Sequence, residues 1–382
     1  MTFRPTLAAF LLIFLMVPGA YALETKARAA LLVDYNTGTV LLEKNADQAL
    51  PPASMSKLMT LNMVFEALED GRLSLDERLP VSEHAMSYGG STMFLNTRDR
   101  VRVEDLIRGV IVLSGNDASA VLAEALAGTE VEFARVMTKR ARQLGMMNST
   151  FANSNGWPHR DQRMSARDLV ILADRLIRHF PQYYVYFAER EFAFDDRSPA
   201  NRFNRNPLLK LDIGADGLKT GHTAEAGYGV VGSATKNGRR VVLMLTGLDT
   251  EADRAREAEK MVNWAFRQFL EKKILTAGQV VETADIWMGR ENSVTLRAAH
   301  DLDLLLPVSA SRQLTAEITL IQPIEAPIEQ GAELAILKIT IPGMQPVEVP
   351  LVAGEAVARS GFLSRLRLSA VILGQSVMTL GN

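Results

Sequence analysis

The sequence is organised around one stretch, Pro51-Pro52-Ala53-Ser54-Met55-Ser56-Lys57-Leu58-Met59-Thr60. Two prolines lead an extended segment into the start of a helix, where Ser54 lies. Lys57 follows three residues later, and residues at this spacing share one face of a helix, so the hydroxyl and the amine can meet. Residues 58–68 are apolar on nearly every side, which indicates a helix buried all round. The serine and lysine are therefore either an unusual feature of the core or a catalytic pair.

The composition indicates a globular protein with a substantial core. The chain has 382 residues, of which 47% are hydrophobic and 23% charged, and this length predicts two or three domains. The net charge of −2 gives no electrostatic footprint for nucleic acid, so no nucleic-acid partner is expected. The histidines lack metal-ligand spacing, no phosphate-binding or dinucleotide-binding loop is found, and there is no cysteine. We therefore expect no metal, no cofactor and no disulfide.

The N-terminus predicts export. Arg4 gives a positive flank, residues 7–17 are continuously apolar, and Ala20-Tyr21-Ala22 fits a signal-peptide cleavage site. The apolar run is too short to span about 30 Å of hydrocarbon, which disfavours a transmembrane anchor. We expect residues 1–22 to be a signal peptide and the mature chain to begin near Leu23.

Residues 29–270 are predicted to form strands at both ends with helices between them. One hairpin is expected over 29–43, and a second over 228–247, where Asn237-Gly238 favours a tight turn. Helices are expected at 54–70, 103–113, 117–127, 131–144, 165–177 and 252–270. This order predicts an α+β fold, in which an antiparallel sheet packs against helices and one subregion is all helical.

The pattern changes near residue 277. Residues 277–360 alternate in short apolar stretches separated by Gly and Pro, which predicts a small β-sandwich-like domain after a catalytic domain spanning 23–276. The small domain shows no cluster of nucleophile, base or metal ligands, so a spacer or docking role is expected. Residues 361–382 have an imperfect amphipathic pattern, which fits either an interfacial membrane anchor or a terminal helix packed on the β-domain.

A serine nucleophile needs a base, and Lys57 is the local candidate. An ordinary lysine with a pKa of ~10.4 is neutral in only about one molecule in 2,500 at pH 7. Burial and a nearby positive charge lower that pKa, so the site is expected to hold a second cation and polar groups that fix the amine. Two downstream segments supply such groups, Ser114-Gly115-Asn116 in an interhelical loop and Lys219-Thr220-Gly221 at the start of the strand region.

The second of these segments suits a substrate that ends in a carboxylate. A cation and a hydroxyl on an edge strand can bind a carboxylate, and Gly221 leaves room for a peptide backbone beside the strand. The backbone N–H just after Gly221 could face Ser54 and form half of an oxyanion hole. The S-x-x-K motif by itself is weak evidence for a catalytic site, because Ser233-Ala234-Thr235-Lys236 also matches it in a hairpin turn. The motifs S-x-x-K, S-x-N and K-T-G together, in this order and each in a suitable structural context, are specific evidence for a catalytic site.

These motifs resemble those of the penicillin-binding proteins and serine β-lactamases. The variants here are similar to the low-molecular-mass, type-5 class of D-alanyl-D-alanine carboxypeptidases, above all in Asp216-Gly217-Leu218-Lys219-Thr220-Gly221-His222-Thr223. Further matches occur at Thr150-Phe151-Ala152-Asn153, Gly156, Ser165-Ala166-Arg167-Asp168, Asn204-Arg205-Asn206 and Ala226-Gly227-Tyr228. The resemblance implies a β-lactamase/transpeptidase-like domain, a small β-domain, and a C-terminal amphipathic helix on the periplasmic face of the inner membrane.

The resemblance also implies a role for each residue of the first two motifs. Ser54 would attack the carbonyl between two D-alanines at the end of a peptidoglycan stem pentapeptide, and Lys57 would accept its proton. Ser114, with Asn116 nearby, would relay the proton to the departing D-alanine and help to hold Lys57. Water would then release the acyl group, whereas β-lactams would leave a long-lived acyl-enzyme.

The third motif would bind the substrate. Lys219 and Thr220 would hold the terminal carboxylate, with Arg254 a weaker candidate because its helix equally fits a solvated face. The backbone N–H groups of Ser54 and His222 would stabilise the oxyanion, which does not require the imidazole ring. The expected partners are peptidoglycan stem peptides, β-lactams and the surface of the inner membrane, and a homodimer is compatible with the sequence.

Two other functions remain open. A serine β-lactamase shares the acylation chemistry, but no matching glutamate motif lies between Asn116 and Lys219, and Gly115 replaces the usual aspartate. A penicillin-recognising fold without catalysis, acting as a sensor or scaffold, conflicts with the intact Ser54 and Lys57. The balance between carboxypeptidase, transpeptidase and endopeptidase activity depends on the shape of the cleft.

Overall fold

The computed structural model describes residues 23–195, 197, 201–321, 323–342 and 346–361. Contacts within the chain divide it into two compact units. The larger unit comprises residues 25–277 and 300–309, and the smaller unit comprises residues 23–24, 278–299 and the described residues from 310 onward. Each unit has its own sheet and is described separately below.

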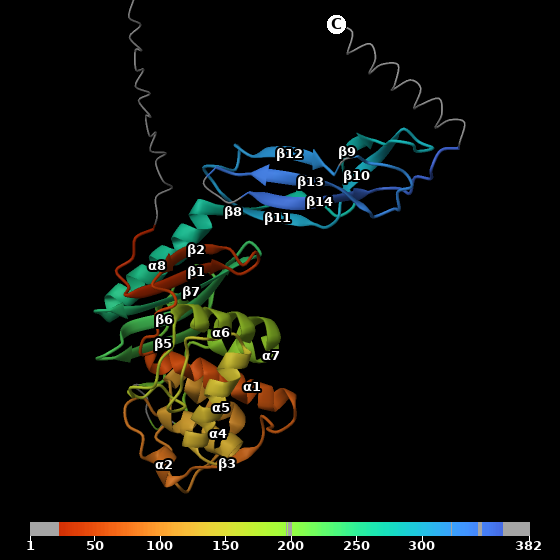
Figure 1. Cartoon of the computed structure of the whole chain (residues 1–382). Helices are drawn as coiled ribbons and strands as arrows, with labels where there is room; N and C mark the ends of the chain where they lie inside the picture. The colour runs from red at the N-terminus through yellow and green to blue at the C-terminus, as the bar shows by residue number, and fades with distance from the viewer. Residues whose placement is uncertain (1–22, 196, 198–200, 322, 343–345, 362–382) are drawn as a thin grey trace, which may run out of the picture. The chain divides into compact units, whose positions relative to one another are not determined.

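The centre of the larger unit is a five-stranded antiparallel sheet in the order β2-β1-β7-β6-β5. Its strands are β1 (Ala29–Asp34), β2 (Val40–Lys44), β5 (Ala215–Thr223), β6 (Gly227–Lys236) and β7 (Arg239–Leu248). The N-terminal hairpin lies in the same sheet as strands from the C-terminal part of the unit's sequence, because β1 pairs with β7, with Leu31 opposite Met244. The predicted α+β fold is confirmed, and β5, which carries Lys219, lies at one edge of the sheet (Figure 1).

Helices cover both faces of this sheet (Figure 1). Leu31 and Met244 belong to a hydrophobic core that includes α1 (Lys57–Glu69) and α6 (Ala166–His179). Their neighbours Leu32 and Leu243 are also fully buried, and because successive strand residues point to opposite faces, they lie on the side of α8 (Glu251–Gln268). The other helices are α2 (Glu83–Met86), α3 (Val103–Arg108), α4 (Asn116–Ala127), α5 (Glu130–Gln143) and α7 (Pro181–Tyr184).

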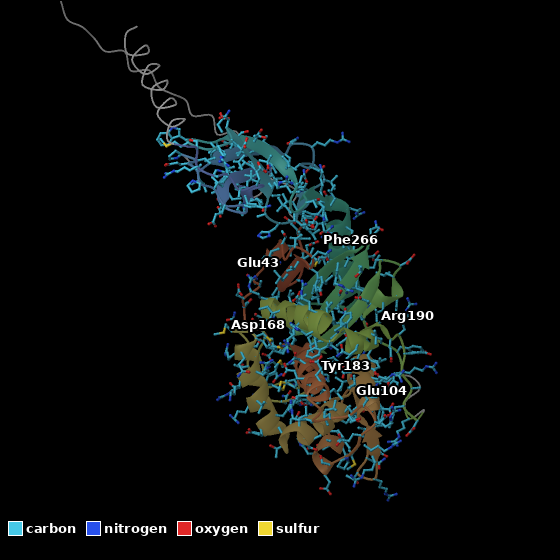
Figure 2. All side chains as sticks on the ribbon, turned by 90° about the vertical axis from the view of Figure 1, so that its right-hand side faces the viewer. Glu43, Glu104, Asp168, Tyr183, Arg190 and Phe266 are labelled. Atoms are coloured by element: carbon cyan, nitrogen blue, oxygen red, sulfur yellow. The ribbon has the colours of Figure 1, made fainter. Side chains whose placement is uncertain are left out.

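Helix α1 is buried on all sides, as its apolar sequence predicts. Leu58, Leu61 and Val64 each have 0% of their surface exposed. Phe65 of the same helix stacks on Tyr183, with 5.0 Å between the ring centroids. Figure 2 shows Tyr183 among the side chains of this unit. Because neighbours pack against every face of α1, the turn that precedes it is held on a rigid support.

Short elements complete the larger unit. They are the helical turns η1 (Ala53–Ser56), η2 (Gly109–Leu113), η3 (Val185–Ala188) and η5 (Pro207–Lys210), and the paired strands β3 (Arg78–Pro80) and β4 (Arg100–Arg102). The helix predicted over 103–113 is α3 followed by η2, a π-helical turn, and such turns are frequent at functional sites.

A two-stranded sheet extends the larger unit beyond the predicted boundary at 276. Strand β8 (Phe269–Leu275) pairs with β11 (Leu302–Pro307), with Glu271 opposite Leu305. The sequence prediction places residues 300–309 in the small domain, whereas this pairing groups them with the larger unit. A strand pattern alone does not reveal its partner, which accounts for the difference.

The smaller unit is all β in its described residues, as predicted. Its five-stranded antiparallel sheet has the order β12-β13-β14-β10-β9. The strands are β9 (Val280–Asp285), β10 (Ser293–Ala298), β12 (Thr315–Leu320), β13 (Glu333–Thr340) and β14 (Val347–Ala353). Leu296, Leu337 and Leu351 are buried within this unit.

The two predicted terminal segments fall outside the described residues. The sequence predicts the signal peptide over 1–22 and the amphipathic helix over 361–382, and of these residues only Gly361 is described. Within the described part of the chain, no helix combines the length and the apolar character needed to span a membrane.

Candidate active site

The nucleophile and its base lie at the junction of η1 and α1. Ser54 is part of η1, a 3-10 turn, and Lys57 is the first residue of α1. The Nζ atom of Lys57 lies 3.0 Å from the Oγ atom of Ser54, within hydrogen-bond distance. Lys57 has 0% of its surface exposed. The short turn therefore presents the hydroxyl to an amine that water does not reach.

Two further oxygen atoms fix the Lys57 amine. Nζ donates hydrogen bonds to Oδ1 of Asn116 and to the backbone carbonyl of Asn155, each at 2.7 Å. When the amine is neutral, it keeps two N–H donors for these two acceptors, and its lone pair can face the Ser54 hydroxyl. This arrangement is the one that a general base requires.

The surroundings of Lys57 favour the neutral amine. Burial is the main cause that lowers the pKa of Lys57 well below its ordinary value, and the positive charge of Arg205 lowers it further. The carboxylates of Asp117 and Glu130 act in the opposite direction. Arg205 therefore supplies the second cation expected near Lys57, although the sequence singles it out only within a matching Asn-Arg-Asn run.

The Ser114 loop is shaped by the π-helical turn before it. Ser114 ends η2 in the left-handed region, with φ of 62°, and is only 2% exposed. Asn116 begins α4, and its Nδ2 donates to the carbonyl of Gly89 at 2.9 Å, which turns Oδ1 toward Lys57. Among the described residues, the hydrogen-bond partners of the Lys57 amine are Ser54, Asn116 and Asn155, so Ser114 does not hold the amine in this state.

Strand β5 forms the opposite wall. Lys219 is 3% exposed and donates to the carbonyl of Thr220 at 3.1 Å. Burial, followed by the positive charge of Lys57, lowers the pKa of Lys219 well below its ordinary value. A Cβ atom on Gly221 would lie 2.9 Å from the carbonyl oxygen of Pro52. Gly221 therefore lets β5 approach η1, which is a different reason from the substrate contact predicted above.

These segments meet at a pocket of about 270 Å³. Its lining combines predicted residues with others that the motifs did not single out. The predicted ones are Ser54, Ser114, Thr220, Gly221, His222 and Arg254, and the others are Ser91, Arg205, Tyr228 and Glu251. Lys57, Asn116 and Lys219 are not in this lining, but Lys57 reaches it through Ser54.

Arg254 and His222 both line the pocket and pack on Tyr228. Arg254 is 3% exposed, donates to Oε1 of Glu251 at 2.7 Å, and lies over the Tyr228 ring at 5.7 Å. It is thus buried beside the pocket, which decides against the solvated helix face left open above. The exposed His222 ring stacks on Tyr228, with 3.8 Å between the centroids.

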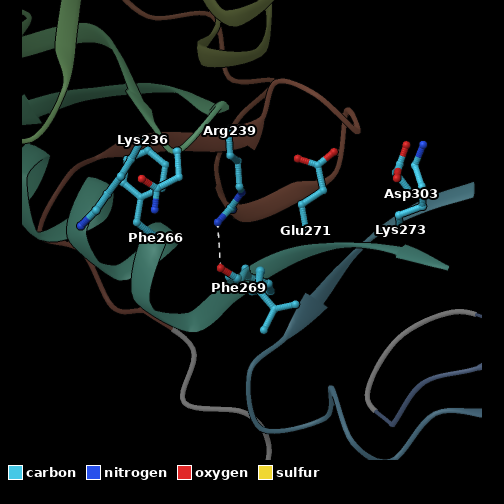
Figure 3. Close-up of a pocket in the computed structure, with 9 residues that line it drawn as sticks. Lys236, Arg239, Phe266, Phe269, Glu271, Lys273 and Asp303 are labelled. Atoms are coloured by element: carbon cyan, nitrogen blue, oxygen red, sulfur yellow. Dashed lines mark hydrogen bonds between the residues drawn. The ribbon is translucent and has the colours of Figure 1, made fainter.

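A second pocket of about 480 Å³ lies where the β6–β7 turn meets β8 (Figure 3). Arg239 donates there to the carbonyl of Phe269 at 2.9 Å and pairs with the buried Asp34. The lining of this second pocket contains no serine, threonine or histidine, so the pocket does not hold a hydroxyl nucleophile paired with a base, as the first pocket does. Across the described residues, no group of three or more His, Cys, Asp or Glu side chains is placed to hold a metal ion.

A serine that lines a cationic pocket and is paired with a buried lysine defines a serine hydrolase of the acyl-enzyme type. Residues 17–250 match the D-alanyl-D-alanine carboxypeptidase family, and residues 269–359 match the penicillin-binding protein 5 C-terminal domain. The chain therefore belongs to the family of D-alanyl-D-alanine carboxypeptidases, which are serine peptidases. The resemblance inferred from the motifs is confirmed, and the family supports the carboxypeptidase prediction over the β-lactamase alternative.

Individual relatives agree with this assignment. The chain is 36% identical to the D-alanyl-D-alanine carboxypeptidase DacC of Escherichia coli, over 94% of this chain and 92% of that protein. The crystal structure of penicillin-binding protein 5 from Haemophilus influenzae superposes with a TM-score of 0.75 at 33% identity, covering 89% of this chain and all of that one. Penicillin-binding protein D2 from Listeria monocytogenes, in its ampicillin-bound form, has a TM-score of 0.58 at 31% identity, covering 64% of this chain and 99% of that one.

Proposed function

We propose that this carboxypeptidase removes the terminal D-alanine from peptidoglycan stem pentapeptides through an acyl-enzyme on Ser54. The observation that carries the proposal is the buried Lys57 amine, 3.0 Å from the Ser54 hydroxyl and held by two other acceptors. A buried lysine with a lowered pKa can act as a base near neutral pH. The pocket beside it has the size and charge to accept a short peptide terminus.

The acylation step uses the first two motifs. Neutral Lys57 takes the proton of Ser54 as Oγ attacks the carbonyl of the bond between the two D-alanines. The backbone N–H groups of Ser54 and His222 stabilise the oxyanion that develops. When the C–N bond breaks, the Ser114 hydroxyl passes a proton from Lys57 to the leaving amine, and Lys57 is neutral again. D-Alanine leaves, and the shortened peptide remains esterified to Ser54.

Cations recognise the substrate's terminal carboxylate. Thr220, Arg205 and Arg254 line the pocket, and Lys219 is buried next to Thr220. A hydroxyl and positive charges that line one pocket favour a free carboxylate over an extended chain. This preference supports the removal of a single terminal residue, which is carboxypeptidase action.

Hydrolysis of the ester completes the cycle and regenerates the serine. Water attacks the acyl-enzyme with Lys57 as the base, and the proton returns to Oγ as the tetrapeptide departs. β-Lactams enter the same pocket and acylate Ser54, but their acyl group stays attached and blocks water. The ampicillin-bound form of the Listeria relative supports this inhibition.

The decisive experiment separates acylation from turnover. The purified chain is incubated with labelled penicillin and, separately, with a peptide ending in D-Ala-D-Ala, and free D-alanine is assayed. We expect one adduct, on Ser54, together with D-alanine release, and neither in Ser54→Ala. An adduct on another residue would overturn the scheme, and rapid penicillin turnover without D-alanine release would instead indicate a β-lactamase.

A change at Arg205 tests the electrostatics of the base. Acylation requires neutral Lys57, so its rate rises with pH through the pKa of Lys57. The charge of Arg205 lowers that pKa, so Arg205→Gln should raise it. The acidic limb of the plot of acylation rate against pH is then expected to move to higher pH by roughly half a pH unit. Stopped-flow acylation at saturating penicillin measures this limb, and Arg205→Lys should restore it. A limb that stays in place in Arg205→Gln would show that Arg205 does not tune Lys57.

We also propose that the protein works in the periplasm, attached to the outer face of the inner membrane by residues 361–382. The signal-peptide pattern of residues 1–22 and the amphipathic stripe at the C-terminus support this location. The exported protein should begin at Leu23 and sediment with membranes, and a chain ending at residue 360 should be released into the soluble fraction. Equal sedimentation of the two forms would contradict the anchor.

A further inference from the structure

Glu130 is a buried carboxylate that the mechanism above does not use. It is the first residue of α5 and is 6% exposed. Its Oε1 accepts hydrogen bonds from the backbone N–H (2.9 Å) and the hydroxyl of Ser154. Its Oε2 accepts a 2.6 Å bond from the Tyr88 hydroxyl and lies 2.7 Å from Nε2 of His84. One carboxylate thus joins three segments that are distant in sequence.

These contacts keep Glu130 charged. Burial raises the pKa of Glu130, but hydrogen bonds from Ser154, Tyr88 and His84 outweigh it and hold the pKa below its ordinary value. The first turn of a helix also favours a negative charge. A charge this well satisfied in the interior resists any movement of its donors, because each would leave a buried group unpaired.

The loop that Glu130 holds is the one that holds the base. The carbonyl of Ser154 accepts a hydrogen bond from the Thr60 hydroxyl of α1. The next carbonyl, that of Asn155, accepts the 2.7 Å bond from the Lys57 amine. The loop is thus tied on one side to Glu130 and on the other to α1, with the Asn155 carbonyl directly after the tied residue.

We propose that Glu130 is a positioning residue for the acylation of Ser54: it holds the Ser154–Asn155 loop so that the Asn155 carbonyl meets the Lys57 amine. The inference rests on the proposed function, since it assigns Glu130 a part in the same step. Glu130 is absent from the pocket lining, so it acts through the loop and not on the substrate.

The charge of Glu130 has a second effect on the same amine. Three charged groups shift the pKa of Lys57: Arg205 lowers it, whereas Asp117 and Glu130 raise it. The charge of Lys57 in turn lowers the pKa of Lys219. Loss of the Glu130 charge therefore lowers the pKa of Lys57 and moves the acidic limb of the acylation profile to lower pH. This direction is opposite to that expected for Arg205→Gln.

Two substitutions separate the position of the loop from the charge. Glu130→Gln keeps an oxygen that accepts from Ser154 and offers an N–H₂ to the Tyr88 oxygen. The hydrogen bonds that hold the loop are therefore largely retained while the charge is lost. We expect its acidic limb to fall by roughly half a pH unit. Its plateau rate should stay within about threefold of wild type. Glu130→Ala removes the hydrogen bonds that hold the loop as well as the charge, and its plateau rate of acylation should fall roughly tenfold to a hundredfold.

The measurement is stopped-flow acylation of the purified chain by a fluorescent penicillin across pH, with the adduct mapped by mass spectrometry. Glu132→Gln is the matched control, because Glu132 lies on the same turn but is exposed and pairs with Arg135. It should leave both the limb and the plateau unchanged. Ser154→Ala, which removes one of the two Ser154 bonds, should show a smaller plateau loss without the shift in the limb.

Each outcome has a distinct meaning. An unshifted limb in Glu130→Gln together with a wild-type plateau in Glu130→Ala overturns the proposal. If Glu130→Ala does not fold, an unshifted limb in Glu130→Gln with a wild-type plateau in Ser154→Ala overturns it equally. Failure of the wild-type chain to label Ser54 would instead refute the proposed function.

Discussion

Replacement of Lys57 by methionine is expected to reduce acylation by penicillin about a thousandfold to ten-thousandfold. The change removes the base and leaves Ser54 with its ordinary, weakly nucleophilic hydroxyl. Methionine has a similar length and suits a position with no exposed surface, although it leaves the Asn116 and Asn155 oxygens without their donor. We therefore expect a folded protein with a nearly abolished rate, measured by stopped-flow labelling alongside thermal unfolding.

Two controls separate the base from the charge and from the motif. Lys57→Arg keeps a positive charge but cannot deprotonate near neutral pH, so it should be as inactive as the methionine variant. Lys236→Met alters the second S-x-x-K motif, Ser233 to Lys236, whose lysine is exposed at the end of β6, and should acylate normally. A rate within tenfold of wild type in Lys57→Met would show that another group is the base.

Local patterns explain which parts of the fold were predictable. The hairpins formed by β1–β2 and β6–β7 follow from turn residues flanked by apolar runs, and the buried α1 follows from its composition. The pairing of β1 with β7 links residues about two hundred positions apart, and only the order of elements hinted at it. The pairing of β11 with β8 had no such hint, because several neighbouring segments have equally suitable strand patterns.

The residues of the site whose side chains take part in the chemistry could be predicted from the sequence. The backbone groups and distant side chains that hold them in place could not. Ser54, Ser114 and Thr220 were found from motifs, and the structure places all three at one pocket. The Asn155 carbonyl that holds Lys57 could come from any residue type, so the sequence carries no signal for it. Glu130 was equally hidden, because its four hydrogen-bonding contacts come from segments far apart in sequence.

Gly156→Ala is expected to produce the second large effect, on both stability and acylation. Gly156 has φ of +84°, and an added Cβ would lie 1.9 Å from the carbonyl oxygen of Ala53. That carbonyl belongs to the peptide that leads into Ser54, and Gly156 directly follows the Asn155 carbonyl that holds Lys57. The added methyl must therefore displace the nucleophile or the support of its base. We expect a loss of about 2–5 kcal/mol in the free energy of unfolding.

Acylation should fall with this displacement by roughly a hundredfold, the cost of about 1 Å of misplacement in a site of this kind. Gly145→Ala is the matched control: its φ is +82°, but nothing lies within 4 Å of an added Cβ. That variant should lose only about 1–2 kcal/mol from backbone strain and should acylate at the wild-type rate. Urea unfolding and penicillin labelling of both variants give the comparison. Equal losses of stability and unchanged acylation in the two variants would show that the close packing of Gly156 on the Ala53 peptide does not position the nucleophile.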